Sequence, residues 1–259
     1  MMKRCFFVLV AVACCACSKS VCVSSEVKEE VVELNFSVPV QATKVAGYVT
    51  EDAVETLQVF VFDENGQVQS SGMADGNSLT LTCTTGEKEI AAVVNSTPLE
   101  GISDLDKLKD RMSDFNDNSV ERFVMSGTVS SNLIASGSVD IPVKRLVSKV
   151  TLSSVTRSFR LKQHQNMDFE LQSVFLTNAP QQTGFFRSLQ SDQLINNGET
   201  DMNAIIAAAG DLLYDDLEDV PVAQDEKAEI GNFLYCYPNI HADATTPAYL
   251  VLQTRLGSG

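Results

Sequence analysis

Hydrophobic and polar side chains alternate along much of the chain, and the clearest example lies near its start. From residue 32 to residue 40 every second side chain is apolar, with polar side chains or proline between them. A period of two turns one face of an extended strand toward a protein core. The pattern therefore predicts a strand with inward residues Val32, Leu34, Phe36, Val38 and Val40. Pro39 favours an edge position, because proline cannot donate a hydrogen bond to a neighbouring strand.

Later segments continue the strand pattern. Asn65-Gly66 follows an apolar stretch and supplies the positive φ angles that a tight hairpin turn requires. The run 90–94 is apolar on both faces, which is typical of a central strand. We predict strands at residues 57–62, 67–69, 79–83, 90–94, 123–125, 139–143, 146–155, 169–176, 233–237 and 249–252.

Helical spacing occurs in two places. Apolar side chains recur at helical intervals from Leu105 to Met112, behind an Asp104 that can cap a helix, and residues 204–213 form a second short helical pattern. The acidic stretch 215–219 lacks the spacing of an EF-hand, so we interpret it as a solvated loop and predict no metal site. Many short strands and few helices predict an all-β protein of sandwich architecture.

The first residues indicate export. Lys3 and Arg4 precede an apolar run that ends at Ala16. This run is shorter than the roughly 20 residues that a membrane-spanning helix needs, so residues 1–16 are interpreted as a signal peptide. A plain secretory signal is one reading of this segment.

The favoured reading is a lipoprotein signal, because the segment resembles a bacterial lipobox. In such a motif small residues precede a cysteine that receives a diacylglyceryl group. Cys17 is the predicted lipidation site and Cys14 is the alternative. Residues 17–30 would then tether the folded part of the chain to outer-membrane lipid.

Charge and cysteine content argue against several classes of partner and site. Removal of residues 1–16 leaves 17 basic and 34 acidic residues, a formal charge of −17, which argues against nucleic acid as a partner. The cysteines that would remain unmodified are Cys22, Cys83 and Cys236, and their scattered positions make neither a disulfide framework nor a zinc site.

No motif for catalysis or nucleotide binding is present. The sequence contains no Gly-x-Ser-x-Gly elbow and no glycine-rich phosphate loop, so we predict that the chain is not an enzyme and uses no cofactor. One function is compatible with these absences and is kept as the alternative to the function described next: a surface lipoprotein that binds a glycan or another host or bacterial ligand and does not polymerise. The absence of tryptophan weakens that alternative, although five tyrosines remain.

Three segments together resemble the major fimbrial subunit family of Bacteroidales, the FimA-type fimbrillins. They are Leu57–Asp63, Cys83–Asn95 and the basic, apolar strand Val143–Leu152, in the order and spacing of that family. The resemblance extends from about residue 32 to residue 256. It implies a subunit of a type V pilus that supports adhesion and has other fimbrial subunits as partners.

The resemblance also implies a fold and an assembly mechanism. Family members have two transthyretin-like β-sandwich domains and reach the outer membrane as lipoproteins. A protease specific for Arg or Lys then removes the N-terminal segment with its first strand, and a strand of a neighbouring subunit fills the open groove. Lys44 and Val45 stand where the family carries its cleavage site, and the strand from Val32 to Val40 would be displaced.

The length of about 240 residues after the signal also favours two domains. We expect an N-terminal domain at 31–147 and a C-terminal domain at 148–259, with one short helix in each. Chains of the family continue well beyond the position of Leu256. We therefore expect the second domain to be incomplete in this sequence; the alternative is a tip or anchor member that accepts a strand without donating one.

Overall fold

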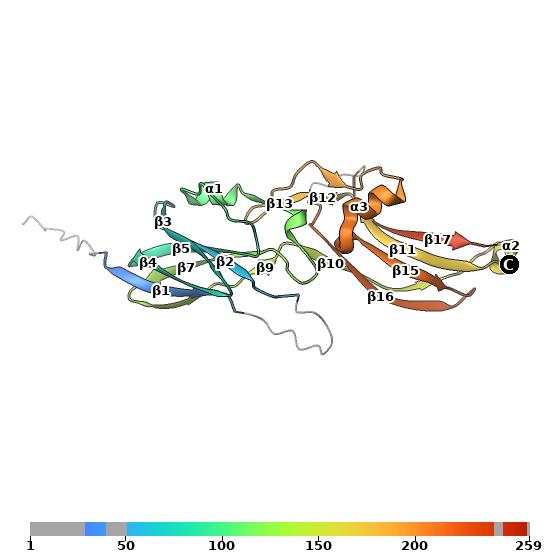
Figure 1. The fold of residues 1–259 in the computed structure, drawn as a ribbon, viewed down its shortest axis with the longest axis horizontal. Coiled ribbons are helices and arrows are strands. Elements are labelled where there is room, and N and C mark those ends of the chain that lie inside the picture. The colour runs from blue at the N-terminus through green and yellow to red at the C-terminus, as the bar shows by residue number, and fades with distance from the viewer. Residues whose placement is uncertain (1–28, 40–50, 241–245, 258–259) are drawn as a thin grey trace, which may run out of the picture.

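The computed structural model describes residues 29–39, 51–240 and 246–257 and has a predominantly β fold. The first half contains β1 (Val31–Ser37), β2 (Thr56–Phe62), β3 (Val68–Asp75), β4 (Ser78–Thr84), β5 (Gly86–Val94), α1 (Leu105–Lys109), β6 (Met112–Asp114), the 3-10 helix η1 (Phe115–Asp117), β7 (Met125–Leu133), β8 (Gly137–Asp140) and β9 (Lys144–Arg145). The second half contains β10 (Ser148–Thr156), α2 (Lys162–Gln165), β11 (Phe169–Thr177), β12 (Ala179–Pro180), β13 (Gln182–Gly184), β14 (Leu194–Ile195), α3 (Met202–Leu213), β15 (Tyr214–Pro221), β16 (Lys227–Cys236) and β17 (Tyr249–Leu256). The molecule is elongated, with β1 toward one end and α2 at the other (Figure 1).

The first hydrophobic core lies between two sheets. A five-stranded sheet has the order β3-β2-β5-β7-β9, and a three-stranded sheet has the order β4-β1-β8. Apolar side chains of both sheets form one buried cluster, which we call the first core. Helix α1 covers the opposite face of the larger sheet, where Leu108 packs against Phe60, Phe62 and Ala91. The side chain of Asp104 caps this helix by accepting a hydrogen bond from the Lys107 N–H, as predicted.

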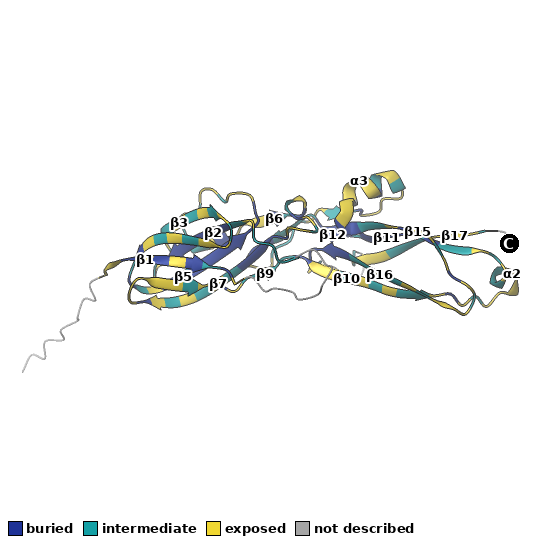
Figure 2. Ribbon diagram, turned by 60° about the horizontal axis from the view of Figure 1, so that its bottom comes forward, coloured by how far each residue is buried: buried dark blue, intermediate teal, exposed yellow. Residues whose placement is uncertain are grey.

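The second core lies between smaller sheets. The pair β10-β16 and the three strands β15-β11-β17 enclose a cluster that includes Leu171, Val174 and Leu234. Helix α3 contributes Leu212 and Leu213 to this cluster. Figure 2 shows the buried residues of the two cores as separate dark regions along the long axis.

Short contacts connect the two halves. Strand β6 of the first half pairs with β13 of the second. The Tyr237 hydroxyl lies 2.8 Å from Ser113 Oγ and accepts a hydrogen bond of 2.8 Å from the amide of Asn118. Phe115 and Phe123, which precede β7, are buried in the second core. The halves therefore meet through both backbone pairing and packed rings.

The all-β expectation is confirmed, and most predicted strands are present. The acidic stretch 215–219 was wrongly interpreted as a loop, because it lies within β15. Leu217 is buried in the second core and Val220 packs against it, while Asp216, Glu218 and Asp219 are exposed. Met112 is also not helical: α1 ends at Lys109, and Met112 begins β6.

Two strand boundaries also differ from the prediction. Phe123 and Val124 precede β7 but are fully buried, so their apolar character reflects packing and not a strand. The hairpin after β2 is present, with Gly66 at a φ of 72°. Asn65 is not among the described residues with positive φ, so Gly66 alone supplies the required conformation.

Candidate functional site: the slot that holds the first strand

Strand β1 lies in the middle of its sheet. It pairs antiparallel with β4 over seven residues, from Val31 opposite Thr84 to Ser37 opposite Ser78, and parallel with β8 on its other side. The expected edge position was wrong, because Pro39 lies beyond the paired residues and interrupts no backbone hydrogen bond of the strand. We call the space between β4 and β8 the slot.

Four side chains of β1 fill the slot. Val32, Leu34, Phe36 and Val38 are exposed by 6%, 2%, 0% and 1%, and all four belong to the first core. Burial of such side chains contributes roughly 1.5–3 kcal/mol each, or about 6–12 kcal/mol together. That sum is similar to the whole free energy of unfolding of a typical domain. The first core therefore depends on a strand in the slot.

Polar contacts fix both ends of β1. At its start, the Thr85 N–H donates to the Glu30 carbonyl at 2.8 Å, and the Glu30 N–H donates to Thr85 Oγ1 at 3.0 Å. At its end, the Val38 N–H donates to the Asn77 carbonyl at 2.9 Å. These contacts set the register of β1 independently of its apolar side chains.

The chain continues from β1 to the rest of the protein through residues 40–50. The predicted cleavage site, Lys44 and Val45, lies in that segment, outside the described residues, as does Val40. The predicted lipidation residues Cys17 and Cys14 also lie outside them. Hydrolysis anywhere between residues 40 and 50 would leave β1 attached to the remainder by non-covalent contacts.

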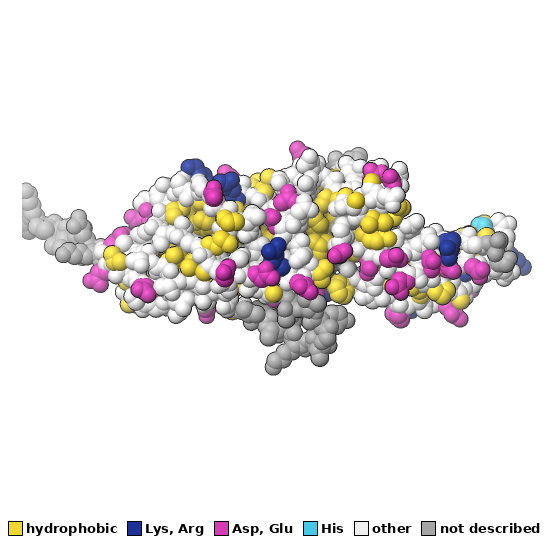
Figure 3. Space-filling model, viewed as in Figure 1, with side chains coloured by type: hydrophobic (Ala, Val, Ile, Leu, Met, Phe, Trp, Pro, Cys, Tyr) yellow, Lys and Arg dark blue, Asp and Glu magenta, His cyan; other side chains and the backbone are white. Residues whose placement is uncertain are grey.

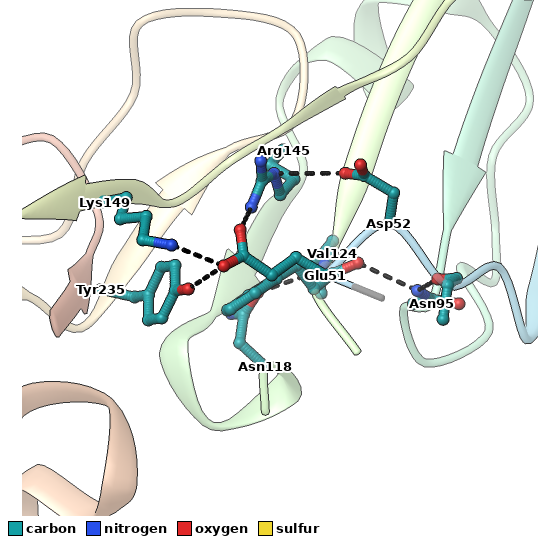
Figure 4. Close-up of polar contacts among 10 residues, drawn as sticks. Glu51, Asp52, Asn95, Asn118, Val124, Arg145, Lys149 and Tyr235 are labelled. Atoms are coloured by element: carbon teal, nitrogen blue, oxygen red, sulfur yellow. Dashed lines mark hydrogen bonds and ion pairs between the residues drawn. The ribbon is translucent and has the colours of Figure 1, made fainter. Parts of the chain in front are cut away.

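Glu51 is the first described residue after that segment, and three side chains hold its carboxylate (Figure 4). Lys149 Nζ lies 2.7 Å from Oε1, and the Tyr235 hydroxyl donates to the same oxygen at 2.5 Å. Arg145 Nη1 donates to Oε2 at 2.5 Å and places its Nε 3.5 Å from Asp52 Oδ1. We call these residues the Glu51 clasp.

The clasp joins elements of both halves. Arg145 belongs to β9, Lys149 to β10 and Tyr235 to β16. Lys149 Nζ also lies 3.7 Å from the centre of the Phe233 ring, a cation–π contact. A further anchor follows at once, because the Asn95 side chain accepts a hydrogen bond from the Glu55 N–H and donates to the carbonyl of Ala53. The segment after residue 50 is thus fixed at several points.

Protonation of Glu51 is strongly disfavoured. Burial alone would raise the pKa of this carboxyl, but the hydrogen bonds from Lys149, Tyr235 and Arg145 outweigh it and lower the pKa from 4.5 to about 2. Burial and the hydrogen bond to Glu51 raise the pKa of Tyr235 above its usual range, so Tyr235 remains a hydrogen-bond donor.

Replacing Glu51 by glutamine is expected to lower the free energy of unfolding by about 1–2 kcal/mol at pH 7, a value reduced by solvent screening. Because the folded-state pKa is depressed, the contribution of Glu51 is complete above pH 4.5 and disappears as the pH falls toward 2. Urea denaturation of both proteins between pH 2 and pH 7 measures this difference. Glu55→Gln is the matched control, because Glu55 is 58% exposed and pairs with Arg122 at 3.6 Å; an equal loss for both variants would contradict a special role of Glu51.

Among the residues that the structure describes, no group of three or more His, Cys, Asp or Glu side chains lies close enough to hold an ion. Cys83 and Cys236 are buried free thiols in different cores. No helix in the described ranges is long and apolar enough to cross a membrane. Tyr235 and Tyr237 are buried, so neither can stack on a sugar.

The slot and the clasp together describe a β protein whose first strand completes its first core. The sequence profile of the major fimbrial subunit protein (FimA) family matches residues 32–167, which is more than half of the chain. The chain belongs to this family. It is therefore a non-enzymatic structural subunit of a cell-surface fimbrium, a class of protein that associates with other fimbrial subunits.

Solved structures share the fold. A fimbrilin (fimA) from Porphyromonas gingivalis W83 is 11% identical, with 85% of this chain and 70% of that chain covered and a TM-score of 0.58. A candidate cell adhesion protein from Bacteroides eggerthii is 16% identical, with 89% and 76% covered and a TM-score of 0.63. The tip fimbrial protein Mfa3 from Porphyromonas gingivalis is 14% identical, with 87% and 79% covered and a TM-score of 0.51. A comparison with curated proteins gave no significant match.

Proposed function

We propose that this chain is a subunit of a type V pilus that assembles by strand exchange: cleavage after Lys44 frees β1, and a strand of a neighbouring subunit takes its place. The observation that carries the proposal is the central position of β1 in the sheet β4-β1-β8. Loss of β1 leaves β8 without a described partner strand and exposes an apolar slot. Unpaired strand edges of this kind bind another strand.

The energetics favour exchange over simple loss. An empty slot would forfeit about 6–12 kcal/mol of apolar burial, which a single domain rarely tolerates. A replacement strand with apolar residues at alternate positions restores both the burial and the backbone hydrogen bonds. The clasp supports the same proposal, because Glu51 and the Asn95 contacts hold the chain just after the proposed cut and do not involve β1.

We also propose the organisation that precedes assembly. Lipidation at Cys17, or at Cys14, would attach the precursor to the outer membrane through residues 17–30. The two cores would lie mainly in domains at 31–147 and 148–259, joined by β9 and β10, with Phe115 and Phe123 of the first domain reaching into the second core. The fimbria would present the chain for adhesion to a host or bacterial surface. Figure 3 shows acidic side chains distributed over one face, consistent with an acidic surface that stays soluble during export.

Processing is tested with the variant Lys44→Gln in the full-length chain, expressed in a bacterium that builds such fimbriae. We expect the amount of this chain in sheared surface fibres to fall at least about tenfold, since a neutral side chain removes the recognition site of a Lys- or Arg-specific protease. Lys162→Gln is the control, because Lys162 is exposed in α2, far from β1.

N-terminal sequencing of the fibres provides the second readout. The expected first residue of the assembled chain is Val45. Fibres whose subunits begin at a lipidated Cys17 would overturn the exchange proposal. A monomer that is retained on a glycan array, with no fibre in any condition, would instead support the alternative of a ligand-binding surface lipoprotein.

A further inference from the structure

Lys88 is an unusual residue of the sheet that faces the slot. It lies in β5 on the same face as Ile90, Ala92 and Val94, because side chains alternate along a strand, and these three apolar residues belong to the first core that β1 completes. Lys88 is only 4% exposed. A basic side chain therefore ends a row of apolar side chains on the inner face of the larger sheet.

The ammonium of Lys88 lies at the end of the slot where β1 begins. Its Nζ is 3.7 Å from the place that a Cβ on Gly86 would occupy. Gly86 follows Thr85, whose backbone and hydroxyl bind the backbone of Glu30. The charge of Lys88 also acts on the thiol of Cys83, which is the partner of Val32 across the β1–β4 pair. Gly86 and Cys83 thus locate the ammonium near the first residues of β1.

Lys88 forms no ion pair with any residue that the structure describes. Its ammonium reaches solvent at the end of the slot, since Arg157 Nε is the one fully buried side-chain nitrogen or oxygen without a hydrogen-bond partner among the described residues. The acidic neighbours Glu87 and Glu89 occupy alternate positions of β5 and so point to its other face, where Glu89 accepts a hydrogen bond from Ser130. Glu30, two residues before Val32, is the next inward position of the resident strand and is exposed. A buried or nearly buried cation is stabilised by an opposite charge.

We propose that Lys88 recognises an acidic side chain in the strand that occupies the slot, at the position held here by Glu30. The inference rests on the proposed strand exchange and specifies the partner. The incoming strand has four apolar residues at alternate positions, preceded two residues earlier by Asp or Glu. The apolar residues supply affinity, and the carboxylate opposite Lys88 sets register, because a strand displaced by two residues would place an apolar side chain there.

The test uses the full chain, cleaved after Lys44 with the resident fragment still bound. Synthetic peptides of residues 29–38 compete for the slot in 50 mM NaCl, and native mass spectrometry measures displacement of the fragment. Glu30→Lys in the peptide is expected to weaken displacement about five- to tenfold. Glu33→Lys is the matched control, because Glu33 lies on the exposed face of β1 and should change displacement less than twofold.

Changes in Lys88 and in salt complete the test. With Lys88→Gln the unmodified and Glu30→Lys peptides should become equivalent within about twofold, and Lys88→Arg should restore the difference. If Lys88→Gln does not fold, 0.5 M NaCl applied to the unchanged protein gives the same information, because screening should reduce the difference between the peptides.

The outcomes separate this inference from the function on which it rests. If no peptide displaces the resident fragment, strand exchange itself is wrong. If all three peptides displace it equally well, strand exchange stands and the role of Lys88 is wrong. A preference for the Glu30→Lys peptide would also overturn the inference.

Discussion

Replacing Phe36 by alanine is expected to lower the free energy of unfolding of the intact chain by about 3–5 kcal/mol. Phe36 is fully buried near the end of β1, where it pairs with Leu79 of β4 and Val139 of β8. Truncation leaves a cavity between two packed sheets, and because backbone pairing fixes the strands within each sheet, the surroundings collapse only partly to fill it. Urea denaturation followed by circular dichroism measures the change.

Val31→Ala provides the matched control on the same strand. Val31 is 74% exposed, so its truncation should change the free energy of unfolding by less than about 0.5 kcal/mol. A loss below about 1 kcal/mol for Phe36→Ala would mean that β1 is not an integral part of the first core. The same result would undermine the proposal that the slot must be refilled when β1 leaves.

The inward residues of β1 were predictable because alternation is a local property of the sequence. Four of the five predicted side chains, Val32, Leu34, Phe36 and Val38, are buried in the first core, and Val40 lies outside the described residues. The central position of the strand was not predictable. A period of two specifies which face is buried but not how many strands pair with it, and β8 begins about 100 residues after β1.

The Glu51 clasp shows the same limit more sharply. Its partners Arg145, Lys149 and Tyr235 are 94, 98 and 184 residues away from Glu51 in the sequence. The segment Val143–Leu152 stood out as basic and apolar, yet nothing near it indicated which acid it would bind. Only the folded chain brings these charges together, so sequence patterns revealed one side of the contact and missed the other.

The misassigned acidic stretch has a different cause. Charged residues favour loops on average, but backbone pairing with β11 and the packing of Tyr214, Leu217 and Val220 on the second core hold 214–221 as a strand. A register irregularity between Leu171 and Ser173 accompanies positive φ angles at Glu218 and Asp219. Tertiary packing thus overrode local composition, as it commonly does for strands.

Loss of β1 is expected to increase the alkylation rate of the Cys83 thiol at least about 100-fold. In the intact chain Cys83 is 4% exposed and is the partner of Val32, so alkylation requires the slot to open, at a cost of ~3 kcal/mol or more. Burial raises the pKa of this thiol, while the charge of Lys88 opposes the rise. Departure of β1 removes that burial, so the pKa falls and the reactive thiolate becomes more abundant at pH 8.

The measurement is pulsed alkylation at pH 8 followed by peptide mass spectrometry, before and after cleavage and release of the resident fragment. Cys236 is the internal control: it is buried in the second core, where burial raises its pKa to about 11. Its rate should stay constant, and a peptide of residues 29–38 should protect Cys83 again. If both thiols become reactive together, cleavage has unfolded the whole chain, and β1 is not a separable strand. Selective exposure of Cys83 would instead mean that the slot opens while the second core stays folded, as assembly by strand exchange requires.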